Sequence, residues 1–163
     1  MRRFGISALL IGLIGGLFGF FVTPEACLAC SCLPPGSPTE ERDKYAAVFR
    51  GRVTAVSQEQ TARGFRVQRV TFEVDRAWKG PVTSTMTVYT GAGGGDCGYN
   101  FQQGADYLVY ASQSQSDEFL PANAFATGIC SRTRPIAQAG DDLAALGPGN
   151  PPAPGSLPNL PST

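Results

Sequence analysis

The five cysteines are the residues of this 163-residue chain whose type and spacing suggest chemistry. Cys27, Cys30 and Cys32 lie close together near the start, whereas Cys97 and Cys130 lie far along the chain. Cysteine thiols form disulfides, bind zinc or take part in redox exchange. We favour disulfides, because the residues before Cys30 resemble an export signal and exported proteins fold in oxidising compartments. A redox pair of Cys27 with Cys30 and a four-cysteine zinc site are the alternatives.

The chain contains no histidine. This excludes the Ser-His-Asp and Cys-His nucleophile systems, the HExxH metalloprotease helix and the Cys2His2 zinc site. Its 13 basic residues balance 13 acidic residues, so the composition lacks the basic excess that is typical of nucleic-acid binders. We therefore expect a protein that is not an enzyme, holds no cofactor and does not bind nucleic acid.

The start of the chain has the pattern of an export signal. Arg2 and Arg3 precede an uncharged run over 4–22, and a stretch of mostly small residues over 26–29 follows. Cleavage after Ala29 would remove residues 1–29 and make Cys30 the first residue. We therefore expect a secreted, extracellular protein, or a periplasmic or cell-surface one in a bacterium. An uncleaved membrane anchor and a lipid-modified Cys30 are the alternatives.

The last 17 residues, 147–163, are rich in proline and glycine and carry no charged side chain. Such a composition buries too little apolar surface to offset the entropy of ordering the chain. We expect a flexible tail over 147–163, and one folded domain over 30–146.

The segments between the two ends are short, alternate apolar and polar residues, and are separated by turn residues. Gly51 in mid-strand indicates a bulge, and the inward face changes side between Val67 and Val70. We predict an all-β fold: a five-stranded, closed β-barrel similar to the oligonucleotide-binding fold, with one or two short flanking helices and disulfide staples. The predicted strands cover 46–56, 65–78, 84–90, 105–111 and 124–130, and the predicted helices cover 39–45 and 136–146.

Removal of Cys27 with the signal would leave an even set of four cysteines. A bridge between Cys30 and Cys32 would close a very small ring with poor geometry, so two pairings with Cys97 and Cys130 remain open. In either pairing the start of the chain is tied to two distant segments. Each bridge would contribute about 4 kcal/mol in the chain-entropy model. The sequence thus predicts a rigid chain start.

Charged residues near the end of the predicted domain suggest one further contact. Arg132 and Arg134 flank the last cysteine, and Asp141 and Asp142 follow nearby. We expect a surface ion pair between these two groups. Contact of the arginines with a partner protein is the alternative.

Several short motifs occur in an order that is typical of a known family. The most specific is C-x-C-x-P-P over 30–35, directly after the signal site, and C-G-Y follows at 97–99. The weaker V-F-x-G-x-V, W-K-G and T-G-I-C motifs lie at 48–53, 78–80 and 127–130. With these motifs the chain resembles the inhibitory domain of the tissue inhibitors of metalloproteinases, which belongs to the netrin-type modules. The resemblance covers nearly all of the predicted domain.

The resemblance implies a fold and a disulfide pattern. The family fold is a five-stranded barrel. By the family pattern, Cys30 would pair with Cys97, and Cys32 would pair with Cys130.

The resemblance also implies a function. The α-amino group and the carbonyl oxygen of Cys30 would chelate the catalytic zinc of a partner metalloproteinase, and the side chain of Ser31 would enter the specificity pocket. An α-amino group with a pKa of about 7.7 to 8.0 readily becomes a neutral nitrogen ligand near neutral pH. The inhibitory edge would comprise Cys30, Ser31, Cys32, Leu33, Pro34 and Pro35.

Two departures from the family pattern support an alternative function. Eukaryotic members carry a third disulfide in this domain, and a proline-rich segment stands here where their second domain begins. The alternative is a non-inhibitory, extracellular netrin-type binding or surface module, with or without a lipid anchor on Cys30. In the inhibitor hypothesis the protein is a monomer, its partner is a zinc metalloproteinase, and it has no membrane contact after cleavage unless it is lipidated.

Overall fold

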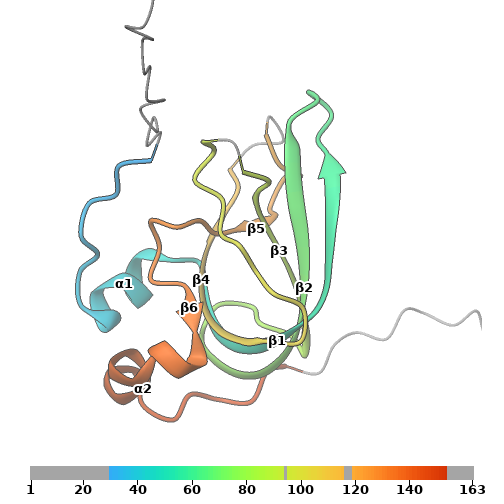
Figure 1. Cartoon of the computed structure of the whole chain (residues 1–163). Coiled ribbons are helices and arrows are strands. Elements are labelled where there is room, and N and C mark those ends of the chain that lie inside the picture. The colour runs from blue at the N-terminus through green and yellow to red at the C-terminus, as the bar shows by residue number, and fades with distance from the viewer. Residues whose placement is uncertain (1–29, 94, 116–118, 154–163) are drawn as a thin grey trace, which may run out of the picture.

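The computed structural model describes residues 30–93, 95–115 and 119–153, and these residues form a mostly β structure with two short α-helices (Figure 1). The predicted export signal over 1–29 lies outside the described residues. In chain order the elements are α1 (Pro38–Lys44), β1 (Ala47–Gln60), β2 (Arg66–Lys79), β3 (Thr85–Gly91), β4 (Asp106–Gln113), β5 (Phe125–Ala126), β6 (Arg134–Pro135), the 3-10 helix η1 (Ile136–Gln138) and α2 (Gly140–Leu146). Among the described residues, no helix is long and apolar enough to cross a membrane.

The strands form a single sheet that closes on itself. Its order is β1-β2-β3-β5-β4-β6, and β1 also pairs with β4, so the pairings run in a ring. Neighbouring strands are antiparallel except for β3 and β5. The predicted mostly-β fold with two short helices and two disulfides is thus confirmed.

The last predicted strand and the last predicted helix differ from the prediction. The strand expected over 124–130 contains only Phe125 and Ala126, because the chain turns after it: Ser131 N–H donates a hydrogen bond of 3.1 Å to the carbonyl of Gly128. The additional short strand β6 follows this turn and pairs with β4. The helix expected over 136–146 is divided at Ala139, where a 3-10 turn ends before α2 begins.

The bulge predicted at Gly51 is confirmed. The register between β1 and β2 shifts between Arg50 and Gly51. A Cβ atom at position 51 would lie only 2.9 Å from the carbonyl oxygen of Glu73, so only glycine allows the strands to approach this closely. Strand β1 curves along the ring and continues into the long β1–β2 hairpin, which extends beyond the ring (Figure 1).

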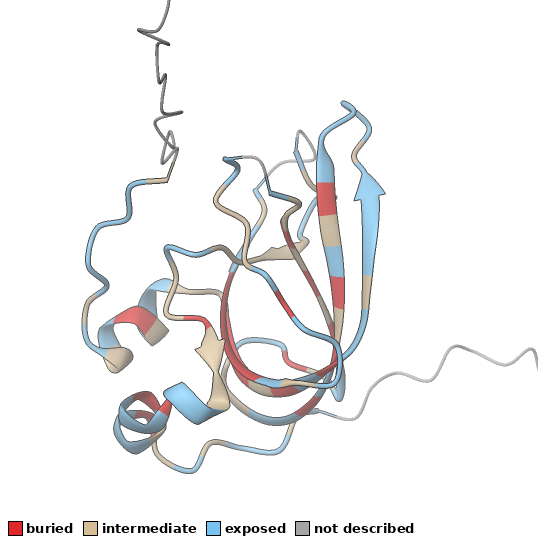
Figure 2. Cartoon of the chain, viewed as in Figure 1, coloured by how far each residue is buried: buried red, intermediate tan, exposed pale blue. Residues whose placement is uncertain are grey.

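The buried apolar side chains form two clusters, one on each face of β1 and β4. Figure 2 shows the buried stretches along the curved strands of the ring. Alternate residues of these strands point to opposite faces of the sheet. Phe49 and Val109 belong to the larger cluster, whereas Val48 and Leu108 pack with Leu146 of α2 in the smaller one. Both strands are therefore apolar on two sides over 47–49 and 107–111. This packing fixes α2 against the sheet.

The first residues of the predicted tail belong to the folded unit. Trp78 Nε1 donates to the carbonyl of Gly147 at 2.9 Å, and Asn150 and Ala77 exchange two backbone hydrogen bonds of 2.8 Å. Ala153 N–H donates to the carbonyl of Val82 at 2.9 Å. The prediction of a flexible tail from residue 147 is therefore wrong for 147–153. The proline-rich backbone finds hydrogen-bond partners here in the backbone of Ala77 on β2, the backbone of Val82 in the loop after β2, and the indole N–H of Trp78. The remainder, 154–163, lies outside the described residues.

Substitution of Gly80 tests the close approach of its backbone to the backbone of Ala46. It has a φ of 90°, and a Cβ atom there would overlap the carbonyl oxygen of Ala46. Gly64 has a similar φ of 83° but open space around it. We expect Gly64→Ala to cost about 1 kcal/mol of unfolding free energy for the left-handed backbone, and Gly80→Ala to cost about 3 kcal/mol because steric overlap is added. Denaturant unfolding measures both; equal losses would contradict this packing.

Candidate functional site

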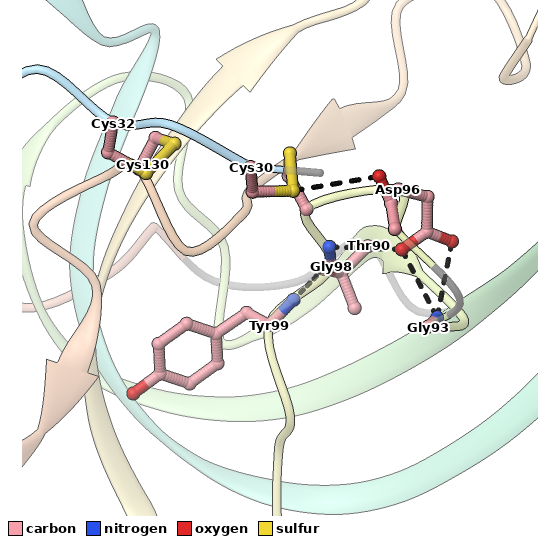
Figure 3. The surroundings of a disulfide bond; sticks show 10 residues. Cys30, Cys32, Thr90, Gly93, Asp96, Gly98, Tyr99 and Cys130 are labelled. Atoms are coloured by element: carbon pink, nitrogen blue, oxygen red, sulfur yellow. Dashed lines mark hydrogen bonds between the residues drawn. A yellow bond between two sulfur atoms is a disulfide. The ribbon is translucent and has the colours of Figure 1, made fainter. Parts of the chain in front are cut away.

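Two disulfides hold the start of the described chain. Cys30 is bonded to Cys97 with a Cα–Cα distance of 5.6 Å, and Cys32 is bonded to Cys130 with a Cα–Cα distance of 5.1 Å (Figure 3). These are the pairs that the family resemblance implies. In this form the four cysteines are not available as zinc ligands, and among the described residues no group of His, Cys, Asp and Glu side chains is arranged to hold a metal ion.

The loop that carries Cys97 is held against β3. The Asp96 carboxylate accepts hydrogen bonds from the N–H groups of Gly93 and Gly98 at 3.1 Å, and Tyr99 N–H donates to Thr90 Oγ1 at 2.7 Å (Figure 3). Asp96 thus stabilises the turn. Its role could not be read from the sequence because its partners are backbone N–H groups.

The two disulfide-bearing loops also contact each other. Ile129 N–H donates to the carbonyl of Cys97 at 3.0 Å. A Cβ atom at Gly128 would lie 2.6 Å from the same carbonyl oxygen, so the approach requires glycine. The partners of Cys30 and Cys32 therefore lie on one joined support rather than on two independent loops.

The predicted inhibitory edge is an exposed segment above this support. Cys30 is half-buried, and Ser31, Cys32, Leu33 and Pro34 are exposed, with 87% of Leu33 accessible to solvent. The Gly95 carbonyl oxygen lies 3.6 Å from Cys30 Sγ. Because a disulfide sulfur carries no hydrogen, this is a packing contact. Of the six predicted edge residues, the five from Ser31 to Pro35 are thus exposed, and Cys30 is half-buried.

Gly36 holds the far end of this segment. Its carbonyl accepts a hydrogen bond of 2.8 Å from Arg132 Nη1, and its N–H donates to Glu41 Oε1 at 3.0 Å. Lys44 Nζ lies 2.7 Å from the same oxygen of Glu41, and its hydrogen bond lowers the pKa of Glu41 although burial opposes the shift. The N-terminal segment is therefore fixed at residues 30, 32 and 36.

Arg132 is itself fixed by a buried carboxylate. Arg132 Nε and Nη2 lie 2.6 and 2.9 Å from the two oxygens of Asp142, and Tyr110 OH donates to Asp142 at 3.0 Å. Arg134 Nη1 lies 3.6 Å from the second oxygen. The predicted pairing of these arginines with Asp142 is confirmed. However, Asp142 is fully buried, because α2 packs against the sheet, so the expectation of a surface pair was wrong.

The charge state of this cluster follows from its contacts. Burial raises the pKa of Asp142, but the hydrogen bonds from Arg132 and Tyr110 outweigh it, so the pKa lies below the usual value. Burial and the hydrogen bond to Asp142 raise the pKa of Tyr110. Asp142 is therefore a carboxylate and Tyr110 a neutral phenol at neutral pH.

An apolar groove of about 400 Å³ lies beside the Asp96 turn. Its mouth carries two exposed aromatic side chains, Phe65 and Phe119, whose ring centroids are 5.1 Å apart. Val67 and Tyr89 also line the groove. The contact of Phe65 with Phe119 leaves no local pattern, because the two residues lie far apart in the sequence. The clamp of Arg132 on Gly36 was missed for a similar reason, since its acceptor is a backbone carbonyl.

No protein-family model matches this chain, and no curated protein is similar enough to match it. A functional proposal therefore depends on the motifs and on the geometry of residues 30–36.

Asp142 provides a stability test. Asp142→Asn would leave the buried guanidinium of Arg132 without its counter-charge, and breaking such a pair costs about 3–5 kcal/mol of unfolding free energy. Asp141→Asn, at the exposed neighbouring position, should change it by less than about 0.5 kcal/mol. Denaturant unfolding at neutral pH measures both. Equal effects of the two substitutions would contradict the role of Asp142.

A comparison of the wild type with Asp142→Asn also tests how the stabilising effect of Asp142 depends on pH. The pKa of Asp142 is lowered in the folded state, so its stabilising effect is complete above the unfolded value of about 3.9 and is lost as the pH falls through the folded pKa. The stability gap between the wild type and Asp142→Asn should therefore narrow below about pH 4. A gap that stays constant down to pH 2 would show that the ionised carboxylate is not its origin.

Proposed function

We propose that this protein is a secreted, netrin-type inhibitor of zinc metalloendopeptidases. The observation that carries the proposal is the exposed segment 30–35, which begins at a disulfide-bonded cysteine, has a second disulfide two residues later and is hydrogen-bonded at Gly36. The ring of strand pairings supports the finer proposal that the fold is a closed barrel similar to the oligonucleotide-binding fold.

The proposed mechanism uses backbone atoms of the first residue. After removal of 1–29, Cys30 would have a free α-amino group beside its own carbonyl oxygen. A catalytic zinc keeps one coordination position open for water or substrate, and a neutral amine and a carbonyl oxygen can occupy that side of the metal. The zinc belongs to the partner enzyme. The chain itself needs neither a histidine nor a bound metal for this role.

The rigidity of residues 30–36 would make this mode of zinc binding effective. A flexible chain end would lose conformational entropy on entering an active-site cleft, and this loss weakens binding. Here the two disulfides and the Gly36 clamp order the segment before any partner arrives. Ser31 lies between the two bonded cysteines and is exposed, so its short side chain is available for the pocket beside the zinc.

The alternative is a non-inhibitory netrin-type binding or surface module. Its lipid-anchored form would require a thioether on Cys30 Sγ. That sulfur is bonded to Cys97 Sγ, and one sulfur atom cannot form both bonds. The unlipidated binding module differs from the inhibitor only in its lack of effect on zinc proteases.

One added alanine tests the chelation. Placed before Cys30 in the mature protein, it would replace the α-amino group by an amide and displace it from the zinc. Inhibition should weaken by more than about a hundredfold, while thermal stability should stay unchanged because both disulfides remain. An alanine added after Thr163 is the matched control. Undiminished inhibition by the extended protein would overturn the mechanism, and a mature wild-type chain that starts elsewhere than Cys30 would remove its basis.

Ser31→Tyr tests the specificity pocket. A large side chain at this position should bind well only to enzymes with a deep pocket, so inhibition constants across a panel of zinc endopeptidases should change by about tenfold or more, and by different factors for different enzymes. The matched control is Ser57→Tyr, at an exposed serine on β1, outside the inhibitory edge. It should leave the inhibition constants of the panel unchanged. A uniform response of all enzymes to Ser31→Tyr would show that residue 31 does not enter the pocket.

A further inference from the structure

One loop holds both ends of the exposed residues Leu33–Pro35, which we call the arch. Cys130 is bonded to Cys32, immediately before the arch, and Arg132 donates to the carbonyl of Gly36, immediately after it. Only one residue separates Cys130 from Arg132 in the sequence. A shift of this loop would therefore move both ends of the arch together.

The arch has no other polar support within the described part of the chain. Its three residues take part in none of the hydrogen bonds found there, and all three are exposed. Pro34 and Pro35 have restricted φ angles and no N–H group. The path of the arch is thus determined by its two ends and by its prolines.

The guanidinium of Arg132 is suited to hold one of those ends in a fixed direction. Two of its nitrogens pair with Asp142, and the third, Nη1, lies 2.8 Å from the carbonyl oxygen of Gly36. A bidentate pairing fixes the plane of a guanidinium, so the direction of Nη1 is fixed as well. Only 13% of the Arg132 side chain is exposed, which leaves it little surface for direct contact with a partner.

We propose that Arg132 is a positioning residue for the inhibitory edge, which acts through the arch rather than by touching the partner enzyme. The effect on inhibition rests on the function proposed above, whereas the effect on the arch does not. Lysine in place of Arg132 would keep the positive charge beside Asp142. With a single nitrogen it cannot form a bidentate pair and also reach Gly36 in the same plane.

The test compares Arg132→Lys with Arg134→Lys. Arg134 approaches the same carboxylate at 3.6 Å and donates to the Arg132 carbonyl at 3.1 Å, but no hydrogen bond among the described residues joins it to the N-terminal segment. Arg132→Lys should raise the inhibition constant about tenfold, as expected for loss of a charge-assisted hydrogen bond, and should increase the backbone mobility of Leu33 and Gly36 in NMR relaxation. Arg134→Lys should do neither.

The outcomes separate the two proposals. Equal effects of the two variants on both measurements would overturn the positioning role. If the wild type inhibits no zinc endopeptidase but arch mobility increases only in Arg132→Lys, the proposed function fails and the positioning role stands. If Arg132→Lys does not fold, the wild type still decides: the Arg132 guanidinium protons should exchange with water more slowly than those of Arg134, and equally fast exchange would overturn the role.

Discussion

The covalent attachment of Cys30 and Cys32 to two loops that touch each other is the constraint on which the candidate site depends. Residues 30–36 lie outside the sheet, and such a segment is ordered only where contacts offset its conformational entropy. Here the partners Cys97 and Cys130 belong to loops that are joined by the Ile129 N–H and are close because Gly128 has no side chain. The order of the sheet is therefore transmitted to residues 30–32. Without the contact between the loops, the two disulfides would tie residues 30 and 32 to two separate loops.

The buried Asp142 extends this order from the disulfides to the end of the arch. A buried ion pair is a weak source of stability, because the cost of removing two charges from water offsets most of their attraction. Here the ion pair instead fixes the orientation of the Arg132 guanidinium. Tyr110 and Arg132 approach the carboxylate from fixed positions, and the remaining guanidinium nitrogen then faces Gly36. Helix α2 is held by its own apolar contacts with β1 and β4, so the carboxylate has a rigid base.

Apart from the two disulfide pairs, which the family resemblance implied, the features predicted correctly from the sequence are those that a local pattern specifies. Gly51 interrupts an alternating strand, and this pattern is enough to locate the bulge. Arg132 and Asp142 have opposite charges near each other in the sequence, so their pairing could be expected. Three further features depend on backbone hydrogen-bond donors or acceptors: the Gly36 clamp, the Asp96 turn and the docking of 147–153. Because nearly every residue has such groups, these contacts cannot be predicted from the sequence. The last predicted helix is divided at Ala139, which is fully buried, and no local pattern in the sequence marks this division.

The same reasoning explains why a zinc-directed function is compatible with this composition. Side-chain chelation of zinc uses histidine, free cysteine or carboxylate groups held close together. The chain has no histidine, its four described cysteines are bonded in pairs, and no group of His, Cys, Asp and Glu side chains among the described residues is arranged to hold a metal ion. Chelation by the α-amino group and carbonyl of Cys30 would require no particular side chain. It would require that cleavage expose this residue and that its backbone be held in place. Such a function depends on position and rigidity, and the features that supply them here are two disulfides, two glycine contacts and one guanidinium.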